Sequence, residues 1–220
     1  MSKRLLLFSQ MNNTVSSDGD VAEQPSVNQP VKVTDCQVIT NNNCIYKLDR
    51  ESKKFYVWIV GVIRDTNNYK AIITVLHSLD KDYEVHIYIH SPGGSISTAC
   101  NILLAMERCK ALIITHNIGM AASCGSLILA FGDKINVYDN AITMFHNSSY
   151  GNLDATHRMI MQTQHIANNT MHLFTLMKDR GIMTEDEITN ITKRGEEYYL
   201  TSAEMRLRLT ENNLWYGEQV

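Results

Sequence analysis

Long apolar stretches are absent from this chain of 220 residues, and Lys and Arg form no cluster along it. The apolar run near the start covers only residues 5–8. A signal peptide needs roughly 7–15 apolar residues and a membrane span ~20, so we expect neither. The net charge of −3 and the pI of about 6.2 argue against nucleic acid or an anionic membrane as a partner. We therefore expect a cytoplasmic protein.

Paired cysteine patterns and the motifs of common cofactors are also missing. An odd number of cysteines without C-x-x-C argues against a disulfide framework and predicts free thiols in a reducing compartment. No H-E-x-x-H, P-loop or G-x-G-x-x-G occurs, so no motif supports a zinc, nucleotide or dinucleotide site. We expect neither a metal nor a bound cofactor in this chain. The five cysteines are Cys36, Cys44, Cys100, Cys109 and Cys124.

Proline is scarce, and two of the three prolines fall in a polar N-terminal stretch. Residues 9–44 are rich in Asn, Ser, Thr, Asp, Gln and Val and show no sustained period. This composition predicts a flexible arm, or a loosely ordered strand, over residues 1–44. The hydrophobic pattern becomes regular from residue 45, so we expect one globular domain over residues 45–220.

Strands and helices alternate in this domain, which predicts an α/β fold with a largely parallel sheet. The helix before Gly181 is the longest, and capping boxes of Thr184 with Glu187 and of Thr201 with Glu204 predict two shorter helices after it. From the apolar periods, the expected strands are 55–60, 85–89, 111–115, 135–138 and 141–145, and the expected helices are 69–76, 99–106, 123–131 and 154–180.

Two turns follow strands, where α/β folds carry their chemistry. In "HSPGGS", residues 90–95, Gly93 and Gly94 permit positive φ and a close approach of another group. Exposed N–H groups there can bind an oxyanion, although Pro-Gly is also common in ordinary turns. In "NIGMAASCGS", residues 117–126, Ser123 follows the strand "ALIIT" and the loop "HNIGM" and opens an apolar helix. It is a candidate nucleophile or an ordinary N-cap.

His146 favours the catalytic interpretation, because it ends the strand "AITMF" and a general base needs a rigid element end. His116 is nearer to Ser123 in sequence, but its loop precedes the serine turn. His86 and His90 share a strand face, but at strand rise they lie about 13 Å apart, too far for one metal.

The stretches "YIHSPGGSIS", "GMAASCGSLILAFGDK" and "MFHNSSYG", in this order, resemble the ClpP family, the proteolytic subunits of the Clp protease. The similarity runs from residue 55 to residue 215. It implies a crotonase-like α/β fold of repeated β/α units, in which the helix 154–180 is the protruding handle between two stacked heptameric rings.

The resemblance also implies the roles of individual residues. Ser123 would be the nucleophile and His146 the general base, and the backbone N–H groups of Gly94 and Cys124 would form the oxyanion hole. The third member of the triad, usually Asp, corresponds to Glu197, with Glu196 beside it. A carboxylate that is one methylene longer can still orient an imidazole.

Two further features depart from the family. Asn147 and Ser148 stand where a Gln-Pro pair usually follows the histidine. Residues 1–44 do not look like the family's N-terminal axial loop, which bears on docking to an unfoldase.

These features predict a serine endopeptidase of the Clp type that cleaves unfolded chains inside a ring-shaped homo-oligomer. ATP would be used only by a separate AAA+ partner. Three alternatives stay open: a Clp-like protease that acts without an unfoldase, for example on a scaffold during particle maturation, a catalytically impaired ring subunit, and an acyl-CoA enzyme of the crotonase fold. The last class does not need a Ser-His pair, so a hydrogen bond between Ser123 and His146 would argue against it.

Overall fold

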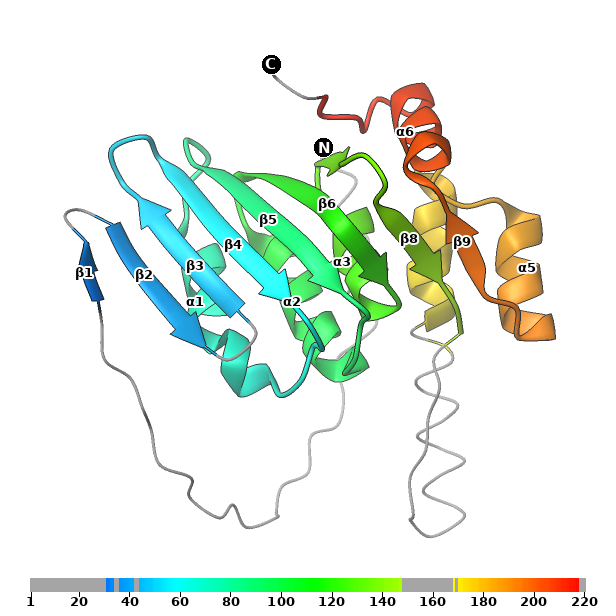
Figure 1. Cartoon of the computed structure of the whole chain (residues 1–220), viewed down its shortest axis with the longest axis horizontal. Coiled ribbons are helices and arrows are strands. Elements are labelled where there is room, and N and C mark those ends of the chain that lie inside the picture. Colours follow the sequence, from blue (N-terminus) through cyan, green and yellow to red (C-terminus); the bar gives the residue numbers. More distant parts are fainter. Residues whose placement is uncertain (1–30, 34–35, 42–43, 148–167, 169, 218–220) are drawn as a thin grey trace, which may run out of the picture.

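One mixed sheet of nine strands forms the centre of the protein in a computed structural model, which describes residues 31–33, 36–41, 44–147, 168 and 170–217 (Figure 1). The strands are β1 Val31–Val33, β2 Cys36–Asn41, β3 Cys44–Asp49, β4 Lys54–Val60, β5 Glu84–Ser91, β6 Leu112–Ala122, β7 Lys134–Val137, β8 Ile142–Phe145 and β9 Tyr198–Leu200. The helices are η2 Thr66–Tyr69, α1 Lys70–Ser78, α2 Ile96–Arg108, α3 Cys124–Ala130, α5 Glu185–Arg194 and α6 Ser202–Glu211, and residues 170–179 are also helical.

The strands follow the order β1-β2-β3-β4-β5-β6-β8-β9, and β7 pairs with β6 beside that path. Neighbours from β4 to β8 are parallel, while β1 to β4 and the β8–β9 pair are antiparallel. The prediction of parallel strands is confirmed for the five predicted strands, β4 to β8, and the edge strands that the sequence did not predict are antiparallel. The connection of residues 50–53 between β3 and β4 is short and allows only an antiparallel return, whereas helices join the parallel pairs β4–β5 and β5–β6.

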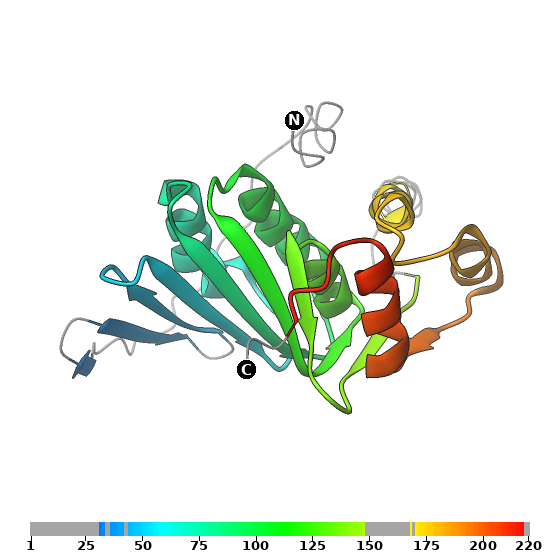
Figure 2. The same cartoon turned by 90° about the horizontal axis from the view of Figure 1, so that it is seen from above.

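Helices α1, α2 and α3 cover one face of the sheet (Figures 1 and 2). The side chains of Phe55, Val57 and Ile59 alternate along β4 and are fully buried against this layer. The predicted helical face of α2 is buried as well, which confirms its period of 3.6. The members of that face are Ala99, Ile102, Leu103 and Met106.

The sheet begins before the predicted start of the domain. Strands β1 and β2 lie within residues 31–41, and β3 begins at Cys44. Residues 1–30, most of the predicted arm, lie outside the described residues. The division at residue 44 therefore stays a prediction.

Strand β6 is longer than predicted, since the segment "HNIGM" continues it to Ala122 instead of forming a loop. The side chain of Asn117 is satisfied inside the sheet. The buried Asn117 amide donates to the carbonyl of Ile142 at 3.0 Å and to Thr143 Oγ1 at 3.1 Å. The register between β5 and β6 shifts between Ile89 and Ser91. On its other edge, β6 pairs with β7 through residues 114–117 and then with β8 through residues 120–122. Ser123 therefore follows directly on a strand.

The C-terminal part agrees with the helix signals of the sequence. Both predicted capping boxes are present, at the starts of α5 and α6. Gly181, with φ = 71°, follows the helical residues 170–179. Most of the predicted handle helix 154–180 lies outside the described residues, so its length and its role stay predictions.

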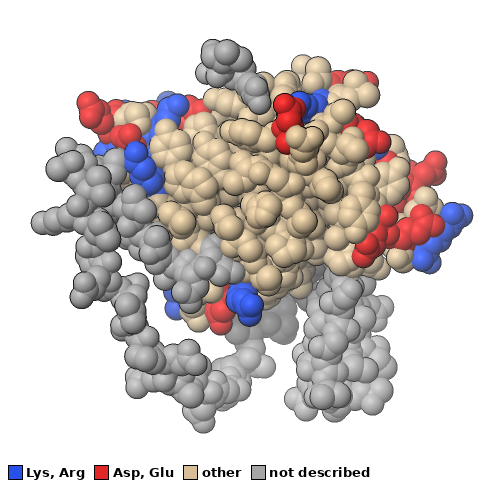
Figure 3. Space-filling model, viewed as in Figure 1, with Lys and Arg blue, Asp and Glu red and all other residues tan. Residues whose placement is uncertain are grey.

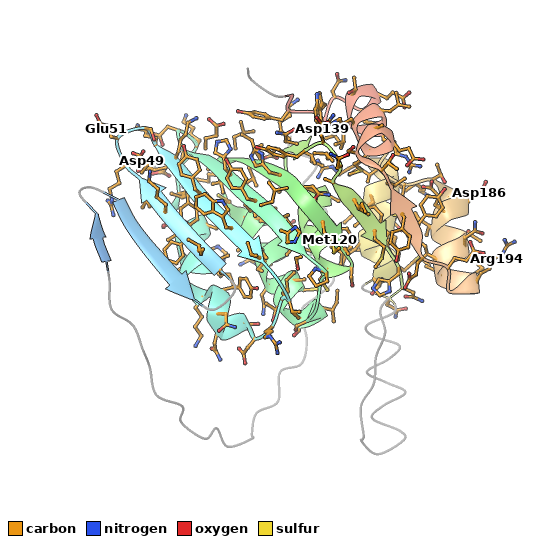
Figure 4. The ribbon with its side chains drawn as sticks, viewed as in Figure 1. Asp49, Glu51, Met120, Asp139, Asp186 and Arg194 are labelled. Carbon is orange, nitrogen blue, oxygen red and sulfur yellow. The ribbon has the colours of Figure 1, made fainter. Side chains whose placement is uncertain are left out.

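The opposite face of β4, β5 and β6 is free of described helices (Figure 2). It carries stacked rings. The ring of Tyr88 stacks on Trp58 and on His116, with centroids 5.3 Å and 4.4 Å apart. In Figure 3 this face is largely uncharged, and the charged residues lie mostly at its margins. Met120 lies on the same side near the end of β6 and is 38% exposed (Figure 4).

Two of the stacked rings, those of His86 and His116, form a buried pair. His86 Nδ1 and His116 Nε2 are 3.0 Å apart, and His86 Nε2 lies 3.1 Å from a carboxylate oxygen of Glu84. Tyr216 donates a hydrogen bond to the same oxygen at 3.1 Å. Burial lowers the pKa of both imidazoles, that of His116 to about 3 with a smaller contribution from His86. Both rings are therefore neutral at pH 7.

Among the described helices, none is long and apolar enough to cross a membrane. The described residues also contain no group of three or more His, Cys, Asp or Glu placed to hold a metal ion.

Candidate active site

Ser123 lies at a sharp turn between β6 and α3. It has φ = 55° and ψ = −123°, an unusual conformation for a residue other than glycine. Its N–H donates to the carbonyl of Met144 at 2.9 Å, and its own carbonyl accepts from the N–H groups of Ser126 and Leu127. The turn is thus fixed by β8 on one side and by the first turn of α3 on the other. Such strained serines at strand–helix turns are typical of nucleophiles.

His146 follows β8, the strand that pairs with the end of β6. Met144 and His146 alternate with the buried Phe145, so they face the helix-free side of the sheet. His146 Nε2 lies 2.8 Å from Ser123 Oγ, a hydrogen-bond distance. When Nε2 accepts the serine proton, the other ring proton is on Nδ1. The structure therefore brings together the two residues that the sequence suggested as nucleophile and base.

The backbone of Gly94 is oriented by Ile63. The N–H of Ile63 donates to the carbonyl of Gly93, and the N–H of Ser95 donates to the carbonyl of Ile63, each at 2.8 Å. In an extended strand the N–H and C=O of one residue point to the same side, opposite to those of its neighbours. The N–H and C=O of Gly94 therefore face away from Ile63. The Cys124 thiol lies on that side, since it donates to the carbonyl of Gly94 at 3.2 Å.

Gly93 packs directly against the serine turn. With φ = 99°, it adopts a conformation that favours glycine. A methyl group at this position would lie 2.6 Å from Ser123 Cβ, 2.8 Å from the carbonyl oxygen of Ala122 and 3.0 Å from the nitrogen of Cys124. The small residues of both turns thus allow two backbone segments to touch beside the Ser123 hydroxyl.

Within the described residues, the N–H groups of Gly94 and Cys124 donate to no backbone carbonyl. Cys124 is the first residue of α3, and N–H groups in the first turn of a helix have no partner within it. The positive end of the helix dipole lies at the same place, although α3 is short. Both groups lie near Ser123. Gly94 follows Gly93, which packs against Ser123, and Cys124 follows Ser123 in the chain.

Glu197 lies just before β9, which pairs with β8. The register pairs Met144 with Tyr199 and Phe145 with Tyr198, and one further step would pair His146 with Glu197. The Glu197 carboxylate, however, accepts a hydrogen bond from the Tyr199 hydroxyl at 2.7 Å. Within the described part of the chain, no hydrogen bond or ion pair joins Glu197 to His146. The structure brings the strand of Glu197 beside the base without joining the two side chains.

Other features of this region could not be read from the sequence. Tyr199 follows Glu197 by two residues and lies on the same strand face, but nothing in the sequence singles out its hydroxyl. Glu196 is exposed, and its N–H donates to the carbonyl of Asn190. His116 lies inside β6 and not in a loop, and its ring bonds to His86. It is therefore not a second base for Ser123.

Comparison with known proteins identifies the family of the chain. The family model "Clp protease" matches residues 40–206. The ATP-dependent Clp protease proteolytic subunit 1 of Leifsonia xyli subsp. xyli (strain CTCB07) is 31% identical over 144 residues, which cover 64% of this chain and 73% of that protein. The α/β fold also agrees with the one that the sequence resemblance implied. The chain is therefore a peptidase of the Clp protease family.

Proposed function

We propose that the protein is a serine endopeptidase that hydrolyses peptide bonds in unfolded polypeptides with Ser123, His146 and Glu197. The observation that carries this proposal is the 2.8 Å contact between Ser123 Oγ and His146 Nε2 at a strained strand–helix turn. The same contact argues against the acyl-CoA alternative, which does not need such a pair.

Ser123 and His146 would divide the reaction into two acyl transfers. In the first, Ser123 Oγ forms a bond to the carbonyl carbon while its proton moves to His146 Nε2. The C–N bond then breaks, and His146 returns the proton to the leaving amine. In the second, His146 takes a proton from water, the water oxygen attacks the ester carbon, and Ser123 leaves with the proton.

The N–H groups of Gly94 and Cys124 would stabilise the negative oxygen of each tetrahedral intermediate. Support comes from the contact of Gly93 with Ser123, the orientation of the Gly94 peptide and the lack of a described acceptor for either N–H. Loss of one oxyanion donor costs other serine peptidases on the order of 10²–10³ in kcat.

Glu197 would hold the Nδ1–H of His146 and stabilise the imidazolium. The β8–β9 register supports this role, because it leads to a cross-strand pair whose Cβ atoms are about 5 Å apart. The Glu197 carboxylate bonds to Tyr199 OH, so it would have to reach His146 with its other oxygen or by a rotation. This bond also supports the second candidate, a catalytically impaired ring subunit.

Assembly and partners belong to the same proposal. Membership of the Clp family supports a homo-oligomer, and two stacked heptameric rings would enclose the sites in a chamber. A separate AAA+ unfoldase would deliver unfolded chains and use ATP, and a protease that acts without one is the alternative. We also propose that the protein works in the cytoplasm.

The hydrolysis of a fluorogenic peptide or of unfolded casein tests the proposal. The wild type should cleave, and Ser123→Ala should not, because this substitution removes the attacking oxygen and little volume. Ser97→Ala, at an exposed serine of α2, is the matched control and should cleave like the wild type. Normal turnover by Ser123→Ala would refute the proposed nucleophile, and an inactive wild-type oligomer would favour the impaired subunit.

A further inference from the structure

The side chain of Cys124 has an unusual position for a cysteine beside a nucleophile. It is 4% exposed, and its thiol donates to the carbonyl oxygen of Gly94, thirty residues earlier in the chain, at 3.2 Å. The thiol thus bridges the two segments that carry the free N–H groups, the Gly93–Gly94 turn and the start of α3.

The thiol acts as a donor and not as a rival nucleophile. Burial raises the pKa of the Cys124 thiol, so the thiol is protonated at pH 7. A cysteine must be a thiolate to attack, whereas only a protonated thiol can donate a hydrogen bond. The 3.2 Å distance is short for a sulfur donor.

The Gly94 backbone needs a hydrogen-bond partner on the side that faces away from Ile63. It has no side chain, its φ is 145°, and Ile63 fixes only the carbonyl of Gly93 and the N–H of Ser95. The N–H and C=O of Gly94 both face away from Ile63, and Cys124 is the only described group that bonds to this carbonyl. A rotation of the Gly94 backbone would turn its N–H away from the serine.

We propose that Cys124 is a positioning residue whose side chain holds the Gly94 peptide, so that the N–H groups of Gly94 and Cys124 point to one place beside Ser123 Oγ. The inference rests on the proposed oxyanion hole and adds a second role to a residue whose backbone N–H forms part of it. The thiol itself contacts neither the substrate nor the transferred proton.

The variants Cys124→Ala and Cys124→Ser test this role as a matched pair. Both lose the sulfur and have nearly the same volume, but only Ser keeps a donor. We expect kcat of the Ala variant to fall about three- to tenfold, the equivalent of one net hydrogen bond, with KM nearly unchanged. The Ser variant should stay closer to the wild type, and the pKa of the kcat profile should not move in either, because the Ser123–His146 contact is untouched.

Cys44→Ala is the control for the loss of a buried thiol, since Cys44 is 1% exposed and lies on β3, which β4 and β5 separate from β6 and the serine turn. It should lower the unfolding midpoint and leave kcat unchanged. Equal kcat for the Ala and Ser variants of Cys124, or wild-type kcat for both, would overturn the positioning role. Failure of the proposed function is a separate result, because then Ser123→Ala would cleave or the wild type would not.

Discussion

Gly93→Ala is the substitution for which the structure makes the sharpest prediction. The new methyl group would lie 2.6 Å from Ser123 Cβ and 2.8 Å from the carbonyl oxygen of Ala122, closer than such atoms approach in proteins. Neither neighbour can rotate away, because Ser123 is fixed by a hydrogen bond to Met144 and Ala122 is part of β6. The serine turn, the glycine turn or both must therefore move.

The free-energy cost has two parts. A φ of 99° strains any residue other than glycine by about 1–3 kcal/mol. Close contacts in a packed site add about 1–3 kcal/mol. Gly93→Ala should therefore lower the free energy of unfolding by roughly 2–6 kcal/mol. Gly195→Ala is the matched control, because Gly195 also has a positive φ, 71°, but a methyl group there would meet no atom within 4 Å. Gly195→Ala should therefore show only the cost of the strained backbone and not that of close contacts.

Two assays separate stability from activity. Denaturant unfolding compares the free energies, and the rate of labelling by a fluorophosphonate reports the serine. A displacement of about 1 Å costs on the order of 10² in rate, so Gly93→Ala should label at least that much more slowly where it remains folded. Gly195→Ala should label like the wild type. Equal stability of the two variants, together with normal labelling of Gly93→Ala, would refute the contact between the glycine turn and the nucleophile.

Three other predictions concern the acid, the histidine pair and the assembly. Glu197→Gln should lower kcat by a factor on the order of 10²–10⁴, and Glu196→Gln should lower it far less, because only Glu197 can orient the base. Equal rates of the two variants in a peptide assay would contradict this role. The folded pKa of His116, about 3, lies below the unfolded value of 6.5, so the unfolded chain takes up the proton first as the pH falls. From this residue alone, the free energy of unfolding in denaturant titrations should drop by roughly 1 kcal/mol between pH 7 and pH 5.5 and continue to drop toward pH 3. A flat profile would show that the ring is not buried and neutral. Light scattering should give about 350 kDa for two stacked heptamers, fourteen times the 25.0 kDa of one chain, and a fully active monomer would contradict the chamber.

The sequence predicted those elements whose signals are local. β4, β5 and α2 have regular apolar periods, and the capping boxes of α5 and α6 need only two residues each. The approach of Ser123 and His146 could be predicted because each follows a strand and parallel strands end at the same edge of a sheet. Their catalytic roles stay predictions.

Features that depend on tertiary partners could not be predicted. The segment "HNIGM" has the composition of a loop, but it is a strand because the amide of Asn117 bonds to β8. The antiparallel edges depend on the partners of β1 to β3 and of β9, which no local period reveals. The bond from Tyr199 to Glu197 and the histidine pair depend on side-chain positions that only the packed sheet fixes.

The most direct test of the central claim is fluorophosphonate labelling of the intact protein, followed by mass mapping of the adduct. Ser123 is the only residue for which the structure combines a strained strand–helix turn, a histidine at 2.8 Å and two free N–H groups nearby among the described residues. We predict one adduct per chain, on the peptide that contains Ser123, and none in Ser123→Ala. An adduct on another residue, or peptide hydrolysis without any adduct on Ser123, would contradict the account.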